Sequence, residues 1–269
     1  MRPPLPAIDD AVHQSMRRHP VRQVSLGAPL RWLALGAADL RRAPLPGLLH
    51  GLAAALFGAL LIAAAGDRFW LLAGAFSGFL LVAPLVATGL YAVSRALARG
   101  RPATLGTALS AWRPHDGRLV VFGLLLALAG TGWVLTSAAM ITGWAEAPVT
   151  NPQDFLRVVV LSGQTYLFEL WLILGSALAA PIFASTVIAI PLLLDRRIGV
   201  HPAVLVSVRA ALLNPAPMAL WATLILGLTV LGMATLLLGL IVVVPLLAHA
   251  SWHAYADLVG PETAAPAAA

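Results

Sequence analysis

Two histidines stand four residues apart in the stretch HASWHAYADL, which closes the last apolar run of the chain. On a helix, His249 and His253 share one face, and Asp257 lies one turn further along it. Zinc-binding helices use a histidine pair at this spacing, but with a third ligand and usually a glutamate between the pair. Here an alanine, a serine and a tryptophan lie between them. The pattern leaves open a metal or haem site, which His50 could join, or an aromatic-belted helix end leaving a membrane.

Glu169 is the second residue that could do chemistry, and it lies in the apolar segment SGQTYLFELWLILG with Gln164 about one turn earlier. A carboxylate inside hydrocarbon is costly and by default marks a functional site, so Glu169 and Gln164 form a candidate intramembrane polar site. The interval 158–194 is too long for one simple span, however, so its first part could lie on the outer surface. Glu169 would then sit near water. Both depths stay open.

The composition places most of the chain in lipid. Hydrophobic residues make up 60% of the 269 positions, charged residues only 10%, and the mean hydropathy is +0.89. An ordinary soluble domain has about 25% charged residues. Charged residues are absent from five long intervals, each able to hold a spanning helix of about 20 residues: 43–66, 69–94, 119–145, 170–194 and 210–256.

The last of these intervals must contain two spans. As one helix at about 1.5 Å per residue, 210–256 would be roughly 70 Å long, over twice the thickness of the hydrocarbon core. It is expected to fold back between Gly232 and Gly239. The sequence therefore predicts an all-α, polytopic membrane helix bundle of six transmembrane helices, at about 45–65, 69–97, 119–141, 163–194, 216–233 and 238–257.

The arginines predict the orientation of the chain. All 17 basic residues are arginine, which we interpret as codon bias of a GC-rich bacterial genome. Under the positive-inside rule they place both termini in the cytoplasm, because only Arg68 and Arg157 fall in the opposite loops. No cleaved signal peptide is expected. These features indicate a multi-pass protein of the bacterial inner membrane.

A three-part repeat organises the predicted spans. Each unit starts with a short amphipathic segment and continues into two spans, the second with a Pro-Leu pair; the segments are 29–42, 104–114 and 201–215. Candidate helix breaks are Pro84, Pro181, Pro191 and Pro245. The amphipathic segments should lie in the cytoplasmic interface, where Arg31, Arg41 and Arg42 would contact anionic lipid headgroups. Around this membrane domain, 25–259, we expect a disordered cytoplasmic arm, 1–24, and a disordered tail, 260–269.

Four segments resemble a family of predicted bacterial integral membrane proteins of unknown function: PLRWLALGAADLRRAPLPGLLHGL, GFLLVAPLVATGLYAVSRALARG, IPLLLDRRIG and LLLGLIVVVPLLAHASWHAYADLV. The resemblance covers nearly all of 25–259 and implies a six-span inner-membrane protein without an established activity. Some members are labelled as a cytochrome c oxidase subunit. This chain has too few histidines near the membrane for a haem-copper subunit, so we do not transfer the label.

Motif searches narrow the function classes. The chain has no cysteine, and it lacks nucleophile elbows, Walker loops, dinucleotide-binding glycine patterns and HExxH, so we predict no enzymatic activity and no cofactor. Membrane lipids are the expected partners, and nucleic acid is not. The sequence favours a non-enzymatic module that handles a lipid or a small solute. Two alternatives remain: a metal- or haem-binding redox-associated membrane protein, and a membrane scaffold or assembly partner.

Overall fold

The computed structural model describes residues 18–65, 68–112, 117–162 and 166–261, and this part of the chain is all-α. Its only extended pairing is an isolated bridge between Val21 and Val259. The helices are α2 (Ala28–Arg42), α3 (Pro44–Ala65), α4 (Phe69–Val86), α5 (Thr88–Ala98), α6 (Leu105–Ser110), α7 (Arg118–Trp144), α8 (Pro152–Asp154), the π-helical segment η1 (Phe155–Val160), α9 (Leu167–Thr186), α10 (Ala189–Asp195), α11 (Val200–Leu213), α12 (Pro215–Ala234) and α13 (Leu240–Leu258).

Four stretches of the described chain are long and apolar enough to cross a membrane: Pro44–Ala64, Arg118–Trp144, Leu167–Asp195 and Pro215–Ala234. Their outward faces carry large apolar side chains, such as Leu60, Leu128 and Ile173, each 65% or more exposed. In water such surfaces would be unfavourable, whereas in lipid they are the expected exterior. The predicted class, an α-helical membrane bundle, is therefore confirmed.

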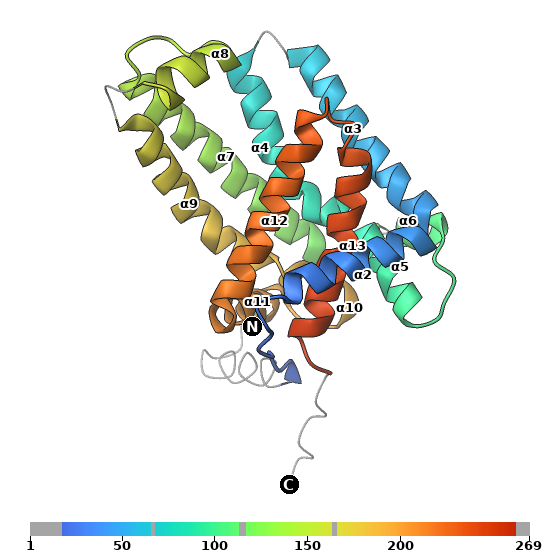
Figure 1. Cartoon of the computed structure of the whole chain (residues 1–269). Coiled ribbons are helices and arrows are strands. Elements are labelled where there is room, and N and C mark those ends of the chain that lie inside the picture. The colour runs from blue at the N-terminus through green and yellow to red at the C-terminus, as the bar shows by residue number, and fades with distance from the viewer. Residues whose placement is uncertain (1–17, 66–67, 113–116, 163–165, 262–269) are drawn as a thin grey trace.

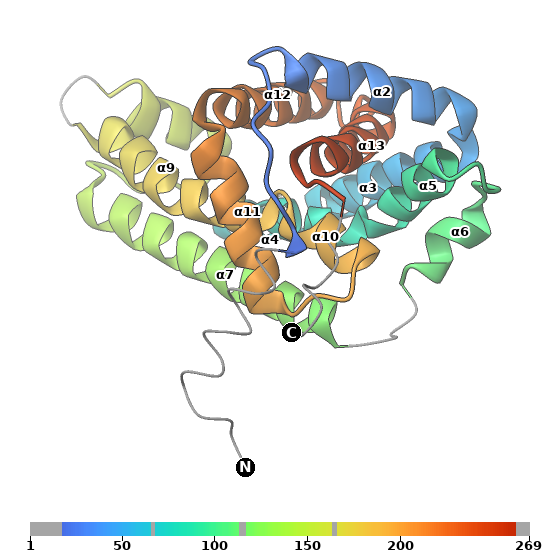
Figure 2. The ribbon, with the colours of Figure 1, turned by 90° about the horizontal axis from the view of Figure 1, so that it is seen from below.

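The long helices run side by side, while α2 lies across them near one end of the bundle (Figure 1). Seen along the bundle, α13 lies within a ring of other helices that includes α2, α3 and α12 (Figure 2). Both ends of the described chain lie at the α2 end. There the backbone of Arg22 donates to Leu258 at 2.8 Å, and Gly260 donates to Pro20 at 2.9 Å. The segments next to the two termini are therefore held together.

Two of the predicted spans are divided in the structure. The expected helix 69–97 breaks at Ala87 into α4 and α5, and 163–194 breaks at 187–188 into α9 and α10. At the second break, Ser207 of α11 bonds the freed backbone groups. Its hydroxyl donates to the Ala184 carbonyl at 2.6 Å and accepts from the Ile188 amide at 3.0 Å. Backbone groups freed inside a bundle need such partners.

The four candidate prolines behave differently. Pro84 lies in the last turn of α4, just before the break at Ala87, and Pro191 lies in the first turns of α10, just after the other break. In contrast, α9 continues through Pro181 and α13 continues through Pro245. Proline lacks an amide hydrogen, so Pro245 leaves the carbonyl of Ile241 without its usual helical donor.

Glycines let α13 approach its neighbours at backbone distance. A Cβ added to Gly51 of α3 would lie 2.2 Å from the Ile241 oxygen, the carbonyl that Pro245 deprives of its donor. A Cβ on Gly36 of α2 would lie 2.7 Å from the Ala250 nitrogen. Small residues at helix crossings are the usual means of tight packing in membranes. Close contact at these glycines therefore sets the position of α13.

The fold-back between α12 and α13 occurs where the sequence predicts it. The turn contains two leucines with positive φ, Leu236 at 54° and Leu237 at 68°. The Thr235 hydroxyl donates to the Gly232 carbonyl at 2.8 Å and accepts from the Gly239 amide at 2.8 Å. This side chain stabilises a turn that the leucines alone would disfavour.

We expect Gly51→Ala to destabilise the protein, because the added methyl group collides with the Ile241 backbone and helices α3 and α13 must separate. The expected loss is about 1–3 kcal/mol in the free energy of unfolding. Gly227→Ala in α12 is the matched control, since an added Cβ there meets nothing within 4 Å. The measurement is the melting temperature in detergent, and equal values for the two variants would contradict the packing described here.

Candidate functional site

Asp39 is the centre of a buried polar cluster that joins three helices. Its Oδ2 atom accepts a hydrogen bond from the Ser94 hydroxyl of α5 at 2.8 Å and another from His253 Nε2 of α13 at 2.8 Å. The residue itself, on α2, is only 4% exposed. Charge-assisted bonds of this kind are about twice as strong as neutral ones. The cluster therefore fixes α2 and α5 against α13.

The hydrogen bonds of this cluster determine which ring nitrogen of His249 carries a proton. Because the single hydroxyl hydrogen of Ser94 goes to Asp39, the Ser94 oxygen must accept from His249 Nδ1, which lies 2.7 Å away. A neutral His249 then carries a lone pair on Nε2, and this atom is buried without a hydrogen-bond partner in the described residues. The Nε2 side of the ring is packed toward α3, where a Cβ on Gly47 would lie 3.7 Å from it.

His50 of α3 shows the same arrangement. Its Nδ1 donates to the Pro46 carbonyl at 2.7 Å, and its Nε2 is buried without a partner among the described residues. The ring lies against Trp112, with centroids 5.3 Å apart. Two histidines that each bond through Nδ1 and leave Nε2 available match the usual orientation of metal ligands. The described residues, however, contain no group of three or more His, Cys, Asp or Glu that could hold a metal ion.

The predicted pair His249 and His253 therefore lies in one cluster, where His253 bonds Asp39 directly and His249 bonds it through Ser94. The Nε2 atom of His253 is bonded to Asp39, and Asp257 is turned elsewhere. Asp257 forms an ion pair with Arg31 and accepts from the indole nitrogen of Trp32 at 2.9 Å. Metal binding by His249 and His253 stays a prediction.

Glu169 lies in the first turn of α9, next to the α8 end of the bundle, and is exposed. A carboxylate at a helix start interacts favourably with the helix dipole, and the role of Glu169 as an intramembrane or interfacial residue stays a prediction. Gln164, its predicted partner, lies outside the described residues.

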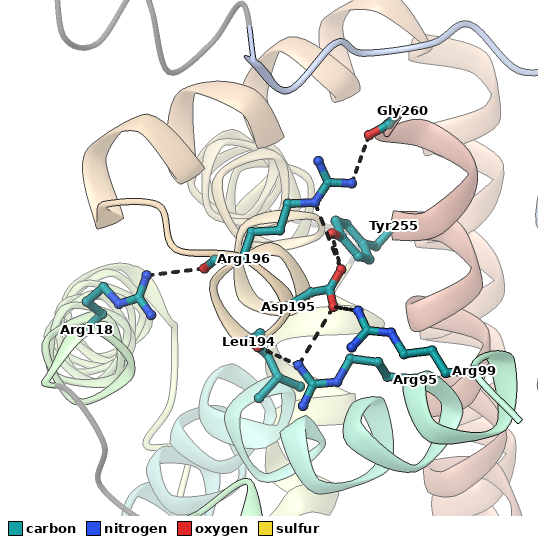
Figure 3. A network of polar contacts seen from close by, with 8 residues as sticks. All are labelled: Arg95, Arg99, Arg118, Leu194, Asp195, Arg196, Tyr255 and Gly260. Atoms are coloured by element: carbon teal, nitrogen blue, oxygen red, sulfur yellow. Dashed lines mark hydrogen bonds and ion pairs between the residues drawn. The ribbon is translucent and has the colours of Figure 1, made fainter. Parts of the chain in front are cut away.

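A second polar network, which the sequence analysis did not identify, surrounds Asp195 at the end of α10 (Figure 3). Arg99 Nη2 lies 2.7 Å and Arg95 Nη1 3.7 Å from its Oδ1, and the Tyr255 hydroxyl donates to Oδ2 at 2.9 Å. Arg196 donates to the Gly260 carbonyl at 2.8 Å, which extends the network to the C-terminal segment. The available signal was the single carboxylate in DRR at the end of an apolar run.

Two adjoining apolar pockets lie beside α3 and α4–α5; the smaller one is completed by α12 and α13, and the larger one by α6 and α13. Their volumes are about 170 and 460 Å³, and they share the walls formed by Ala54, Ala83, Ala87 and Val244. Tyr91, Thr229 and Ser251 contribute the few polar groups of the smaller pocket. His50 and Trp112 close the larger one toward α6. The pockets are mostly apolar, and exposed side chains such as Phe57 and Leu109 form part of the wall of the larger one.

Together these features define a polytopic all-α membrane protein with a polar, arginine-rich end and apolar pockets between its helices. Residues 71–195 match the family model described as Predicted integral membrane protein (DUF2189), a domain of unknown function. Within residues 71–195, this match confirms the resemblance that the sequence indicates. No curated protein and no solved structure matches the chain. The matched region begins in α4 and ends at Asp195, so it contains Ser94 and both arginines that face Asp195.

We expect Asp39→Ala to lower the free energy of unfolding by about 1–3 kcal/mol, because Ser94 and His253 lose their shared buried acceptor. Glu146→Ala, which removes an exposed loop carboxylate, should change stability by no more than about 0.5 kcal/mol. The melting temperatures of the two variants in detergent provide the comparison.

Asp39 is also expected to make the stability of the folded protein depend on pH. Burial raises the pKa of Asp39, but the hydrogen bonds from His253 and Ser94 outweigh burial and hold the pKa below its ordinary value of 3.8. The stabilisation is therefore complete above pH 3.8 and is lost as the pH falls through the folded-state pKa. Asp39→Asn should flatten this acidic part of the stability curve, and an unchanged acid limb would contradict the assignment.

Proposed function

We propose that this protein is a non-enzymatic lipid-binding protein of the bacterial inner membrane, which holds an apolar lipid chain between α3, α4–α5, α12 and α13. The observation that carries the proposal is the pair of adjoining apolar pockets, about 170 and 460 Å³ in volume. An apolar cavity does not hold water well, because water there has too few polar partners. In a bilayer, a lipid chain is the most abundant group that fits such walls.

The wall residues support a chain rather than a polar solute. Ala54, Ala83 and Ala87 line both pockets, and their small side chains leave room where the two pockets meet. A conventional solute path would need more polar groups along it, as in ion-coupled carriers with binding sites at broken helices. The break at Ala87 between α4 and α5 borders this space.

The membrane topology belongs to the same proposal. We infer six spans by adding α4–α5 and α13 to the four apolar stretches, with each pair of spans preceded by a short helix, α2, α6 or α11. The arginine distribution favours cytoplasmic termini. The pairing of Val21 with Val259 supports this placement, since both terminal segments then lie on one side.

The three predicted headgroup arginines fall into two groups. Arg31 forms an ion pair with Asp257, so its charge is partly neutralised within the protein. Arg41 and Arg42 occupy the exposed last turn of α2, and Arg41 borders a groove of about 340 Å³ with Leu48 and Leu246. In the proposed orientation, Arg41 and Arg42 contact anionic headgroups on the cytoplasmic face.

The topology can be tested by cysteine labelling, because the natural chain contains no cysteine. Pro148→Cys lies in the loop after α7, and Arg101→Cys lies in the segment after α5; both positions are exposed. A membrane-impermeant maleimide added to spheroplasts should label the first variant at once and the second only after permeabilisation. The reverse pattern would indicate the opposite orientation in the membrane. Labelling of both variants in intact spheroplasts would contradict the span count.

Lipid binding can be tested with a phospholipid that carries a photoreactive diazirine in its acyl chain. In nanodiscs, irradiation should label wild-type residues on the inner faces of α12 and α13, such as Met233 and Leu247, as mapped by peptide mass spectrometry. Ala54→Leu should reduce this labelling at least several-fold, because the larger side chain fills the wall shared by both pockets.

Ala59→Leu is the matched control for this experiment. Ala59 lies on the same helix, is exposed, and borders neither pocket. Labelling of the inner faces should match that of the wild type. Equal inner-face labelling in the wild type and in Ala54→Leu would sink the lipid-chain proposal.

A further inference from the structure

A pocket at the α8 end of the bundle is lined by five aromatic rings. Its volume is about 290 Å³, and its walls include Phe69 and Trp70 at the start of α4, Trp133 of α7, Phe155 of η1 and Trp171 of α9. Four elements that are distant in the sequence thus bring their rings to one place. This end lies opposite the end that carries α2 and the chain termini (Figure 1).

The rings contact one another in a continuous chain around the pocket. Centroid distances are 5.1 Å for Phe69 and Trp70, 6.1 Å for Phe69 and Phe155, and 5.6 Å for Phe155 and Trp171. Trp133 completes the series at 5.6 Å from Trp171. The ring planes of these pairs meet at angles between 35° and 72°, so they form walls rather than a parallel stack.

The two central tryptophans are held in place before any ligand binds. The Trp171 indole donates to the buried Ser137 hydroxyl at 2.7 Å, which fixes the plane of its ring. Trp133 packs on Gly175 of α9, where an added Cβ would lie 3.0 Å from the indole. An ordinary interfacial aromatic belt needs neither a fixed ring plane nor ring-to-ring contact, because its members face the lipid headgroups individually.

Negative charge lies beside these walls. An adjoining pocket of about 420 Å³ shares Trp70 and Ile141 with the aromatic pocket and includes Glu146. Asp154 precedes Phe155, and hydrogen bonds from Thr150 hold the pKa of its carboxyl below the usual range. Arg68 and Arg157 are the described cations of this end. Glu146 is the carboxylate that lines the adjoining pocket.

We propose that the aromatic pocket binds a quaternary ammonium group. The faces of aromatic rings carry negative potential and attract a cation, and a trimethylammonium group suits such a cage because it is bulky and weakly hydrated. Glu146 adds attraction through the adjoining pocket. The group can belong to a small soluble cation of the choline type or to a choline lipid headgroup. This site is independent of the proposed chain-binding pocket and goes beyond it.

The test compares choline with 3,3-dimethylbutan-1-ol, which has the same shape but no charge. The protein is held in phosphatidylglycerol nanodiscs, and binding is followed by tryptophan fluorescence and calorimetry. Choline is expected to bind roughly tenfold more tightly than the neutral analogue. This comparison uses the wild-type protein and does not depend on any variant folding. Equal affinities, or no choline binding at millimolar concentration, would overturn the proposal.

Variants then locate the site. Trp171→Leu and Trp133→Leu should each weaken choline binding about tenfold, whereas Trp133→Phe, which keeps an aromatic face, should retain most of it. Glu146→Gln should weaken choline binding by a few-fold and leave the neutral analogue unaffected. Trp144→Leu is the matched control, because Trp144 lies at the same end, is 62% exposed and borders neither pocket. Loss of choline binding in Trp144→Leu alone would place the cation elsewhere and overturn the assignment.

A final comparison identifies the source of the cation. If a choline lipid is the ligand, replacing phosphatidylglycerol with phosphatidylcholine in the nanodiscs should abolish the binding of added choline by competition. If a soluble cation is the ligand, the affinity for choline should be the same in both nanodiscs. Either result supports the quaternary ammonium site. Neither depends on photolabelling of the lipid-chain pocket, so the two proposals can fail separately.

Discussion

The close contact of α13 with α2 and α3 is the constraint on which the polar cluster depends. Gly36 and Gly51 lack side chains where backbone meets backbone, and any side chain there would push α13 outward. At this separation Asp39 accepts from His253 of α13 at 2.8 Å, and it also accepts from Ser94 of α5 at 2.8 Å. Packing at two glycines thus brings the two histidines of α13 close to a carboxylate from a distant part of the chain. In lipid, where apolar surfaces gain little by association, such packing and hydrogen bonding hold helices together.

Breaks in the helices are tolerated because the freed backbone groups find partners. Ser207 bonds both sides of the α9–α10 break, and Thr235 does the same at the turn into α13. At Pro245 the carbonyl left without a donor faces Gly51, where a Cα–H group can approach it closely. Asp195 likewise has polar partners, because its carboxylate contacts two arginines and a tyrosine hydroxyl rather than lipid.

The two ends of the bundle differ in chemistry. The α2 end carries the Asp39 and Asp195 clusters and the exposed Arg41 and Arg42, while the α8 end carries the aromatic pocket with Glu146 beside it. Between them lies the apolar space bordered by Ala54 and Ala87. Polar and charged groups therefore gather at the two ends of the bundle, and the walls between them are mostly apolar.

The sequence by itself determined the class of this protein, because a charge-free apolar run has no stable alternative to a helix in lipid, and the match over residues 71–195 agrees with that class. It also located the short helices α2, α6 and α11 and the turn before α13. Helix periodicity placed His249 and His253 on one face, yet it could not show that Asp39, more than 200 positions away, is the acceptor for His253. Likewise, no spacing in the sequence links the aromatic residues of four separate elements, and only tertiary packing gathers them around one pocket. Spacing along a helix fixes which residues share a face, but only the crossing of helices at small residues decides which faces meet.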